Sequence, residues 1–239
     1  MSDRFLNEAE TGQPAYVLVV EQIRKSKIRP GNPLPSEAEL RARLGIGRPQ
    51  LREALAALEI MGAVESRRGA RRTWRGFNPE IQLKNSIVLI DNPERVVGEL
   101  LEVRHTLETS LLPTVVSLLT QSDFVFLRSL ADDMNNLASQ GKTFFEEDEK
   151  FHRTLLKPAK NHVLDGILAT FWGLFESLLD SDDDAVEDPS IASMHGQILD
   201  ALEIGDTRLA VHHLDTHFYG VRNRYPNVRL GTSKNMFVS

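Results

Sequence analysis

The sequence predicts a mainly α-helical protein made of two domains. Two short helical patterns near the N-terminus are joined by a tight glycine turn, an arginine-rich hairpin pattern follows them, and the periodicity after residue 78 is helical throughout. The length of 239 residues suits two domains, and a hydrophobic content of 41% is sufficient for packed cores. We therefore expect an N-terminal domain over residues 1–78 and an all-α bundle of six or seven helices over residues 79–239.

A first helix is predicted over residues 14–27, and two more form a helix-turn-helix over about residues 36–60. Ser36 and Glu39 have the spacing of a capping box, which satisfies backbone N–H groups at a helix start. The turn Gly45-Ile46-Gly47 ends that helix. The second helix tolerates a proline in its first turn, and Gly62 is a typical C-terminal stop. Its buried stripe repeats at helical spacing and comprises Leu51, Ala54, Leu55 and Leu58.

A β-hairpin with five arginines is predicted over about residues 63–75, as the wing of a winged helix-turn-helix. The second helix of such a domain enters the DNA major groove by its N-terminal residues, and phosphate contacts position the protein. Arg48 and Arg52 share one face of that helix because they are four residues apart. An ordinary helical hairpin is the alternative. The candidate DNA-binding residues are Arg48, Gln50, Arg52, Arg41, Arg68, Gly69 and Arg71.

The net charge of −6 conceals an asymmetry between the two predicted domains. Residues 1–78 hold 14 of the 28 lysines and arginines but only 9 of the 34 acidic residues, so their net charge is +5 and the remainder carries −11. A basic N-terminal third joined to an acidic remainder fits a DNA reader attached to a domain with another role.

A set of residues spread over the helix-turn-helix and the start of the wing forms one recognisable pattern: Pro30-Gly31, Leu34-Pro35-Ser36-Glu37, Leu40, Leu44-Gly45, Arg48, Leu51-Arg52-Glu53-Ala54-Leu55, Leu58-Glu59, Gly62 and Val64. This pattern resembles the winged helix of the GntR family. The resemblance implies that Arg48 and Arg52 contact DNA. Ala38 departs from the family pattern, which often has a base-reading arginine there, and Gly47 replaces the usual Ser or Thr cap.

The second domain reads as a series of helices. Pro113 is expected to kink or break a long helix that begins at Asn92-Pro93, and Ser122 is expected to cap the next one. The acidic run at residues 180–188 lacks the glycine and glutamate of a calcium loop, so we interpret it as a solvated connection. The predicted helices cover residues 80–90, 92–119, 122–139, 144–157, 161–179, 189–204 and about 207–224.

Asp148, His152, His195 and His217 are candidate metal ligands. Asp148 and His152 are four residues apart on one helix face, and the other two histidines lie on the apolar sides of later helices. One carboxylate and three imidazoles facing a bundle interior suit a divalent ion, with zinc as the first choice and nickel or manganese as alternatives. Satisfied core histidines are the other interpretation.

A longer pattern in the second domain includes these residues: Arg104 and Glu108, Asp148-x-x-Phe151-His152-x-x-Leu155, Asn161, His195-x-x-Ile198-x-x-Ala201-x-x-x-Gly205-Asp206-x-x-x-Ala210 and His217. With this pattern, the bundle resembles the FCD ligand-binding domain of FadR-subfamily regulators over about residues 80–224. The resemblance implies that Asp148 and the three histidines bind a metal, with His217 rather than His213 as the last ligand. It also places Arg104 in the same cavity.

Arg104 is the candidate effector-binding residue. A guanidinium inside a bundle needs an anion, which is either Glu108 one turn away or the carboxylate of a bound effector. The hypothesis is a regulator that acts as a repressor homodimer on palindromic operator DNA and responds to a hydroxy acid or sugar acid. The alternatives are a metal-dependent enzyme and a regulator that binds an acyl ligand without metal.

Three features bound the protein's location and chemistry. The chain has no cysteine, which excludes disulfides and thiolate metal sites. No stretch resembles a signal peptide or reaches the length of a membrane span. We therefore expect a cytoplasmic protein with no membrane partner.

Overall fold

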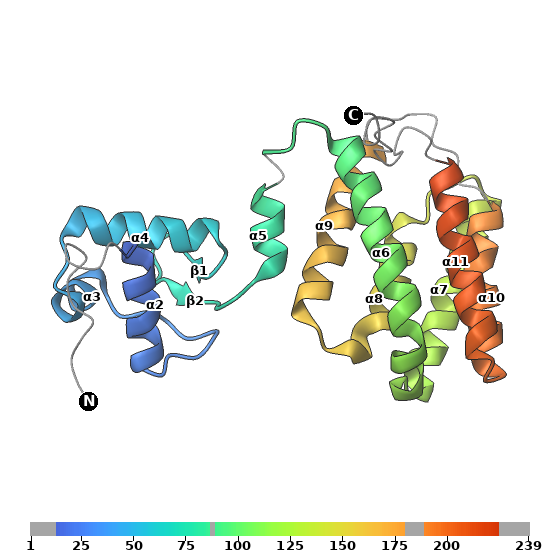
Figure 1. Cartoon of the computed structure of the whole chain (residues 1–239), viewed down its shortest axis with the longest axis horizontal. Helices are drawn as coiled ribbons and strands as arrows, with labels where there is room; N and C mark the ends of the chain where they lie inside the picture. Colours follow the sequence, from blue (N-terminus) through green and yellow to red (C-terminus); the bar gives the residue numbers. More distant parts are fainter. Residues whose placement is uncertain (1–12, 87–88, 180–188, 225–239) are drawn as a thin grey trace, which may run out of the picture. The chain divides into compact units, whose positions relative to one another are not determined.

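The computed structural model describes residues 13–86, 89–179 and 189–224, and the chain divides into two compact units, residues 1–86 and 87–239. Each unit has its own hydrophobic core. The expected architecture of a helix-turn-helix with a small hairpin followed by a helical bundle is confirmed (Figure 1). Among the described residues, no helix is long and apolar enough to cross a membrane.

The first unit contains α2 (Ala15–Lys25), α3 (Glu37–Leu44) and α4 (Arg48–Ile60), which pack around a leucine-rich core. The capping box of Ser36 and Glu39 is present in full at the start of α3. Gly45 follows α3 with a φ of 68°, a left-handed conformation that glycine adopts without steric cost. The leucine stripe of α4 is buried as predicted. The tight turn therefore presents the first residue of α4, Arg48, to solvent.

The wing is a short antiparallel hairpin of β1 (Val64–Glu65) and β2 (Thr73–Trp74). Val64 pairs with Trp74 and Glu65 with Thr73. The segment before α3 adds to the far side of β2, because Trp74 N donates to Asn32 O at 2.9 Å and Leu34 N to Arg72 O at 2.7 Å. Backbone pairing on both sides of β2 anchors the hairpin, whose connecting loop carries Arg68, Gly69 and Arg71.

The division between the units lies eight residues beyond residue 78, because α5 (Pro79–Ser86) belongs to the first unit. Asn85 Nδ2 donates to the carbonyl oxygen of Ile60 at 2.6 Å. A Cβ on Gly62 would lie only 2.6 Å from Ile81 Cβ, so the glycine allows α5 to approach the end of α4. The shift in charge marks the end of the wing rather than the end of this unit.

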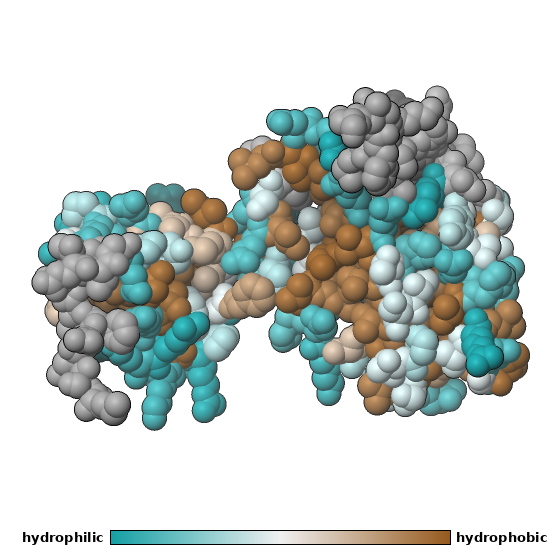
Figure 2. Space-filling view, viewed as in Figure 1, coloured by the Kyte–Doolittle hydropathy of each residue, from teal (hydrophilic) through white to brown (hydrophobic). Residues whose placement is uncertain are grey.

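The second unit contains six α-helices in its described part: α6 (Pro93–Val115), α7 (Gln121–Ser139), α8 (Phe145–Leu156), α9 (His162–Leu179), α10 (Pro189–Glu203) and α11 (Thr207–Arg224). α6 packs on α8, α9 and α11, and α10 packs on α7 and α11. Figure 2 shows hydrophobic residues gathered on one face of this unit, over α6 and α9. The inward faces of α6, α8, α10 and α11 therefore contribute to the interior of the bundle.

Two local expectations in this unit were wrong. α6 is not broken at Pro113 but continues to Val115 and then tightens into a 3-10 turn. The proline lacks the N–H that would bond to the carbonyl four residues earlier, and this single loss lies close to the helix end. Thr120 rather than Ser122 caps α7, and it forms a capping box with Asp123. The acidic run at residues 180–188 lies outside the described residues.

Candidate metal centre and nucleic-acid interface

The structure brings Asp148, His152, His195 and His217 together in the interior of the second unit. They come from α8, α10 and α11, and one ligand atom from each lies within 4.8 Å of the others. The three histidines are at most 1% exposed. His213, one turn before His217, lies outside this group. The four side chains singled out in the sequence therefore form one buried cluster.

Three of the separations between these ligand atoms are close to those around a small ion. Asp148 Oδ1 lies 2.8 Å from His195 Nε2 and 3.2 Å from His152 Nε2, and His152 Nε2 lies 3.2 Å from His217 Nε2. Zinc–nitrogen bonds of about 2.0–2.1 Å in a tetrahedral site place ligand atoms roughly 3.3 Å apart. The donor set of three imidazoles and one carboxylate also suits zinc, nickel or manganese. The residues present therefore fit a divalent metal.

The far ring nitrogens orient two of the histidines. His152 Nδ1 lies 2.5 Å from Glu108 Oε2, and His195 Nδ1 lies 3.3 Å from the carbonyl oxygen of Ala192. Both oxygens are acceptors, so each Nδ1 carries the proton in the metal-binding tautomer and leaves its Nε2 lone pair available. Glu108 was interpreted from the sequence only as a partner for Arg104. Its contact with His152 joins positions 44 residues apart and has no local signal.

Burial and neighbouring charges shape the protonation of this cluster. Burial alone would raise the pKa of Asp148, but hydrogen bonds from His152 and His195 hold it well below its usual range. Burial and the adjacent histidines push the pKa of His217 well below its usual range. Asp148 is therefore ionised and His217 neutral near neutral pH, as a metal site requires.

Arg104 lies beside the cluster and is only 2% exposed. Its Nε donates to Glu108 Oε1 at 2.8 Å, so the predicted ion pair forms. Its Cζ lies 4.3 and 4.4 Å from the ring centroids of Phe171 and Trp172. The ion pair nevertheless leaves Nη2 buried without a hydrogen-bond partner. A buried guanidinium group with a free donor indicates a missing acceptor.

Three buried polar atoms without partners gather in this region. They are Arg104 Nη2, Trp172 Nε1 and His217 Nδ1, and they make up three of the four such atoms among the described residues. The Trp172 and His152 ring centroids lie 6.2 Å apart, and those of His217 and His152 lie 5.1 Å apart. Sequence reasoning did not single out Trp172, although a buried indole N–H usually needs an acceptor.

The candidate DNA-binding residues lie on exposed parts of the first unit. Arg48 begins α4, Arg52 follows one turn later with a side chain 63% exposed, and Arg41 lies on α3. Gln50 is half-buried. Gly47 precedes α4 without a side-chain cap. The start of α4 therefore presents two arginines on one solvent-facing surface, which suits phosphate and base contacts.

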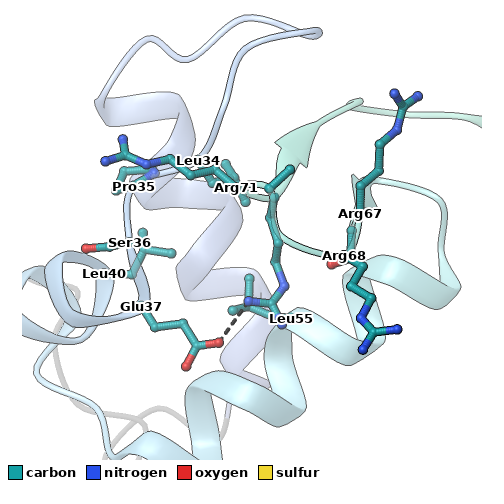
Figure 3. Close-up of a pocket in the computed structure, with 12 residues that line it drawn as sticks. Leu34, Pro35, Ser36, Glu37, Leu40, Leu55, Arg67, Arg68 and Arg71 are labelled. Carbon is teal, nitrogen blue, oxygen red and sulfur yellow. Dashed lines mark hydrogen bonds and ion pairs between the residues drawn. The ribbon is translucent and has the colours of Figure 1, made fainter.

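The wing arginines divide into two groups. Arg72 pairs with Glu37 and Glu59, and Arg67 and Arg75 both pair with Glu65. Among the described residues, Arg68 and Arg71 form no such ion pair. Arg68 and Arg71 line a pocket of about 340 Å³ together with Leu34, Glu37 and Leu40. Figure 3 shows this pocket and the ion pair that Glu37 forms with Arg72. Arg68 and Arg71 are thus the wing cations available to a ligand, whereas Arg72 ties the wing to α3 and α4.

The sequence matches two family profiles that correspond to the two units. Residues 11–72 match the bacterial regulatory proteins, gntR family, and residues 99–220 match the FCD domain. The Uxu operon transcriptional regulator of Escherichia coli is 31% identical over 92% of this chain and 90% of its own length. An uncharacterised regulator of Bacillus subtilis, YcbG, is 28% identical over 86% of each chain.

A further relative and a solved structure agree with these matches. The galactonate operon transcriptional repressor of E. coli is 25% identical over 78% of this chain and 84% of its own length. The Streptococcus agalactiae GntR structure has a TM-score of 0.62 at 22% identity and covers 87% of this chain and 98% of its own, which shows the shared fold. The curated relatives are named as transcription regulators, which favours the regulator over the enzyme alternative. The narrower assignment to the FadR subfamily stays a prediction. The chain belongs to the GntR family of transcription regulators, with a GntR helix-turn-helix and an FCD domain.

Proposed function

We propose that this DNA-binding transcription regulator is a repressor whose operator binding is controlled by a small carboxylate bound beside a divalent metal. The observation that carries the proposal is the buried group of Asp148 and three histidines next to Arg104, whose Nη2 lacks a partner. Arg104 would clamp the carboxylate of the effector by a charge-assisted hydrogen bond. A bound metal would supply a Lewis acid for further oxygen atoms of the effector.

The unpartnered atoms support an effector rich in oxygen. Arg104 Nη2 and Trp172 Nε1 can only donate hydrogen bonds, and His217 Nδ1 donates when its Nε2 binds metal. A hydroxy acid or sugar acid offers the matching acceptors, and one relative is named for the galactonate operon. An acyl chain would leave these donors unsatisfied at a cost of about 1–3 kcal/mol each. The three unpartnered donors therefore favour a hydroxylated acid over an acyl ligand.

Operator control requires two states of the protein. We propose that the protein is a homodimer that reads two half-sites of a palindromic operator, with Arg48 and Arg52 of each protomer in the major groove. The effector shifts the equilibrium between states of high and low DNA affinity only as far as it binds them differently. Light scattering of the purified protein tests the dimer, and a monomer at micromolar concentration contradicts it.

A screen of small carboxylic acids tests the effector and the metal together. Thermal unfolding is measured for protein loaded with Zn²⁺ and for chelated protein, each with single hydroxy acids and sugar acids. We expect at least one acid to raise the Tm only in the presence of metal, because a ligand that binds the folded state stabilises it in proportion to occupancy. We expect Arg104→Ala to abolish that shift. Acids that act equally after chelation would contradict the shared site.

Metal affinity is expected to fall as the pH is lowered through neutrality. Burial alone would lower the pKa of His152, but the negative charge of Glu108 and hydrogen bonds to Asp148 and Glu108 raise it above its usual value. Protonated imidazole cannot coordinate a metal, so protons compete with the metal below that raised pKa. Zn²⁺ affinity measured by chelator competition between about pH 6 and pH 8 should therefore increase with pH. An affinity independent of pH contradicts this.

A further inference from the structure

Glu108 contacts both the candidate metal ligand His152 and the candidate effector-binding residue Arg104. It lies on α6 with no exposed surface. One carboxylate oxygen, Oε1, accepts the hydrogen bond from Arg104 Nε at 2.8 Å, and the other, Oε2, faces His152 Nδ1 at 2.5 Å. The imidazole is thereby connected through one rigid carboxylate to the guanidinium group. The contact with His152 joins α6 to α8, so α6 takes part in the cluster without supplying a metal ligand.

We propose that Glu108 is the positioning residue of this site, which holds His152 in its metal-binding tautomer and holds Arg104 with Nη2 free for an anion. The inference rests on the proposed function, because it takes the Nε2 atoms as metal ligands. A carboxylate on the far nitrogen of a ligating histidine fixes the tautomer and the ring orientation. The same carboxylate occupies Nε of Arg104, and Nη2, which is buried without a partner, is the donor that we assign to the effector.

The substitution Glu108→Gln separates the two contacts with little change of shape. Glutamine has one acceptor oxygen and one NH₂ donor where glutamate has two acceptors. The amide oxygen will face Arg104, because the NH₂ group and the guanidinium N–H are both hydrogen-bond donors and would repel each other. The NH₂ group then faces His152 Nδ1 and favours the tautomer protonated at Nε2. That tautomer presents N–H instead of a lone pair to the metal.

The test is the Zn²⁺ affinity of the full chain without any effector, measured by competition with a chromophoric chelator. We expect Glu108→Gln to weaken Zn²⁺ binding about 10- to 100-fold. Glu99→Gln is the matched control: Glu99 accepts from Arg95 Nε at 2.8 Å with the same i,i+4 spacing on α6, but this pair is exposed. The control should bind Zn²⁺ as the wild type does.

Equal Zn²⁺ affinity in the wild type and in folded Glu108→Gln would overturn the role of Glu108 while leaving the metal site intact. A wild-type protein that takes up no Zn²⁺ would instead overturn the proposed function, and this inference with it. The two failures are therefore distinguishable.

Removing one member of a buried charged pair can prevent folding, so a second measurement uses the unaltered sequence. The ¹⁵N spectrum of the histidine rings in Zn²⁺-loaded wild-type protein reports which nitrogen of His152 carries the proton. We expect Nδ1 to be protonated and Nε2 to be coordinated. Coordination through Nδ1 would overturn the proposal even if Glu108→Gln cannot be purified.

Discussion

Replacing His217 with alanine is expected to abolish the stabilisation of this protein by Zn²⁺. His217 is 1% exposed, and its Nε2 lies 3.2 Å from His152 Nε2 within the four-residue cluster. A metal present at about 100 times its Kd stabilises the folded state by about 2.7 kcal/mol. For a unit of this size that corresponds to a rise in Tm of roughly 5–10 °C. Loss of one of four ligands should eliminate most of this rise.

His213→Ala is the control for that experiment. His213 lies one turn earlier on the same helix and is half-buried, but it does not belong to the cluster. Differential scanning calorimetry with and without Zn²⁺ should show the full metal-dependent rise for His213→Ala and almost none for His217→Ala. Equal shifts in both variants would mean that the cluster is not the metal site. The metal-free Tm of each variant separates loss of metal binding from loss of packing.

Replacing Arg48 with alanine is expected to weaken operator binding about 5- to 150-fold, which is the range for loss of an arginine contact to a base. Arg48 is the first residue of α4, is exposed, and makes no recorded hydrogen bond or ion pair within the described residues. The substitution should therefore leave the stability of the first unit nearly unchanged. The affinity is measured by fluorescence anisotropy on a duplex that the wild-type protein selects from random-sequence DNA.

Arg24→Ala provides a charge-matched comparison on the same unit. Arg24 is exposed in the last turn of α2, away from the start of α4 in the sequence and outside the candidate set. We expect this variant to bind nearly as the wild type does at equal salt concentration. If Arg48 contacts only phosphate, the loss will be uniform across DNA sequences and the salt dependence will decrease by about one counterion. Unchanged affinity in Arg48→Ala would remove α4 from the interface.

Several helix boundaries followed from local residues alone. The Ser36 and Glu39 capping box, the left-handed glycine after α3 and the proline that begins α10 are each decided within one helical turn. The same local geometry places Asp148 and His152 on one face of α8. Thr120 and Ser122 are both suitable N-cap residues for α7, and sequence spacing did not identify the correct one. Side-chain geometry selected Thr120, which forms the capping box with Asp123.

The candidate sites were only partly accessible to sequence reasoning. The family resemblance named all four cluster residues, and the structure places them together. It did not indicate that Glu108 orients His152 or that Trp172 leaves an unpartnered N–H beside them. In the wing, the sequence analysis selected Arg68 and Arg71 from five arginines as candidate DNA contacts, without a physical reason to separate them from the other three. The structure separates those paired with glutamates, such as Arg72, from the available Arg68 and Arg71.

The sequence by itself determined the fold class, because capping, turn chemistry and helical periodicity act over a few residues. The family followed from the resemblance of its motifs to those of known regulators. The tertiary structure decided which side chains meet. Three histidines from α8, α10 and α11 converge on one carboxylate only because those helices pack around a common interior. The docking of α5 on the end of α4 through Gly62 likewise joins residues about twenty positions apart. Such contacts depend on helix packing and burial, which no local pattern encodes.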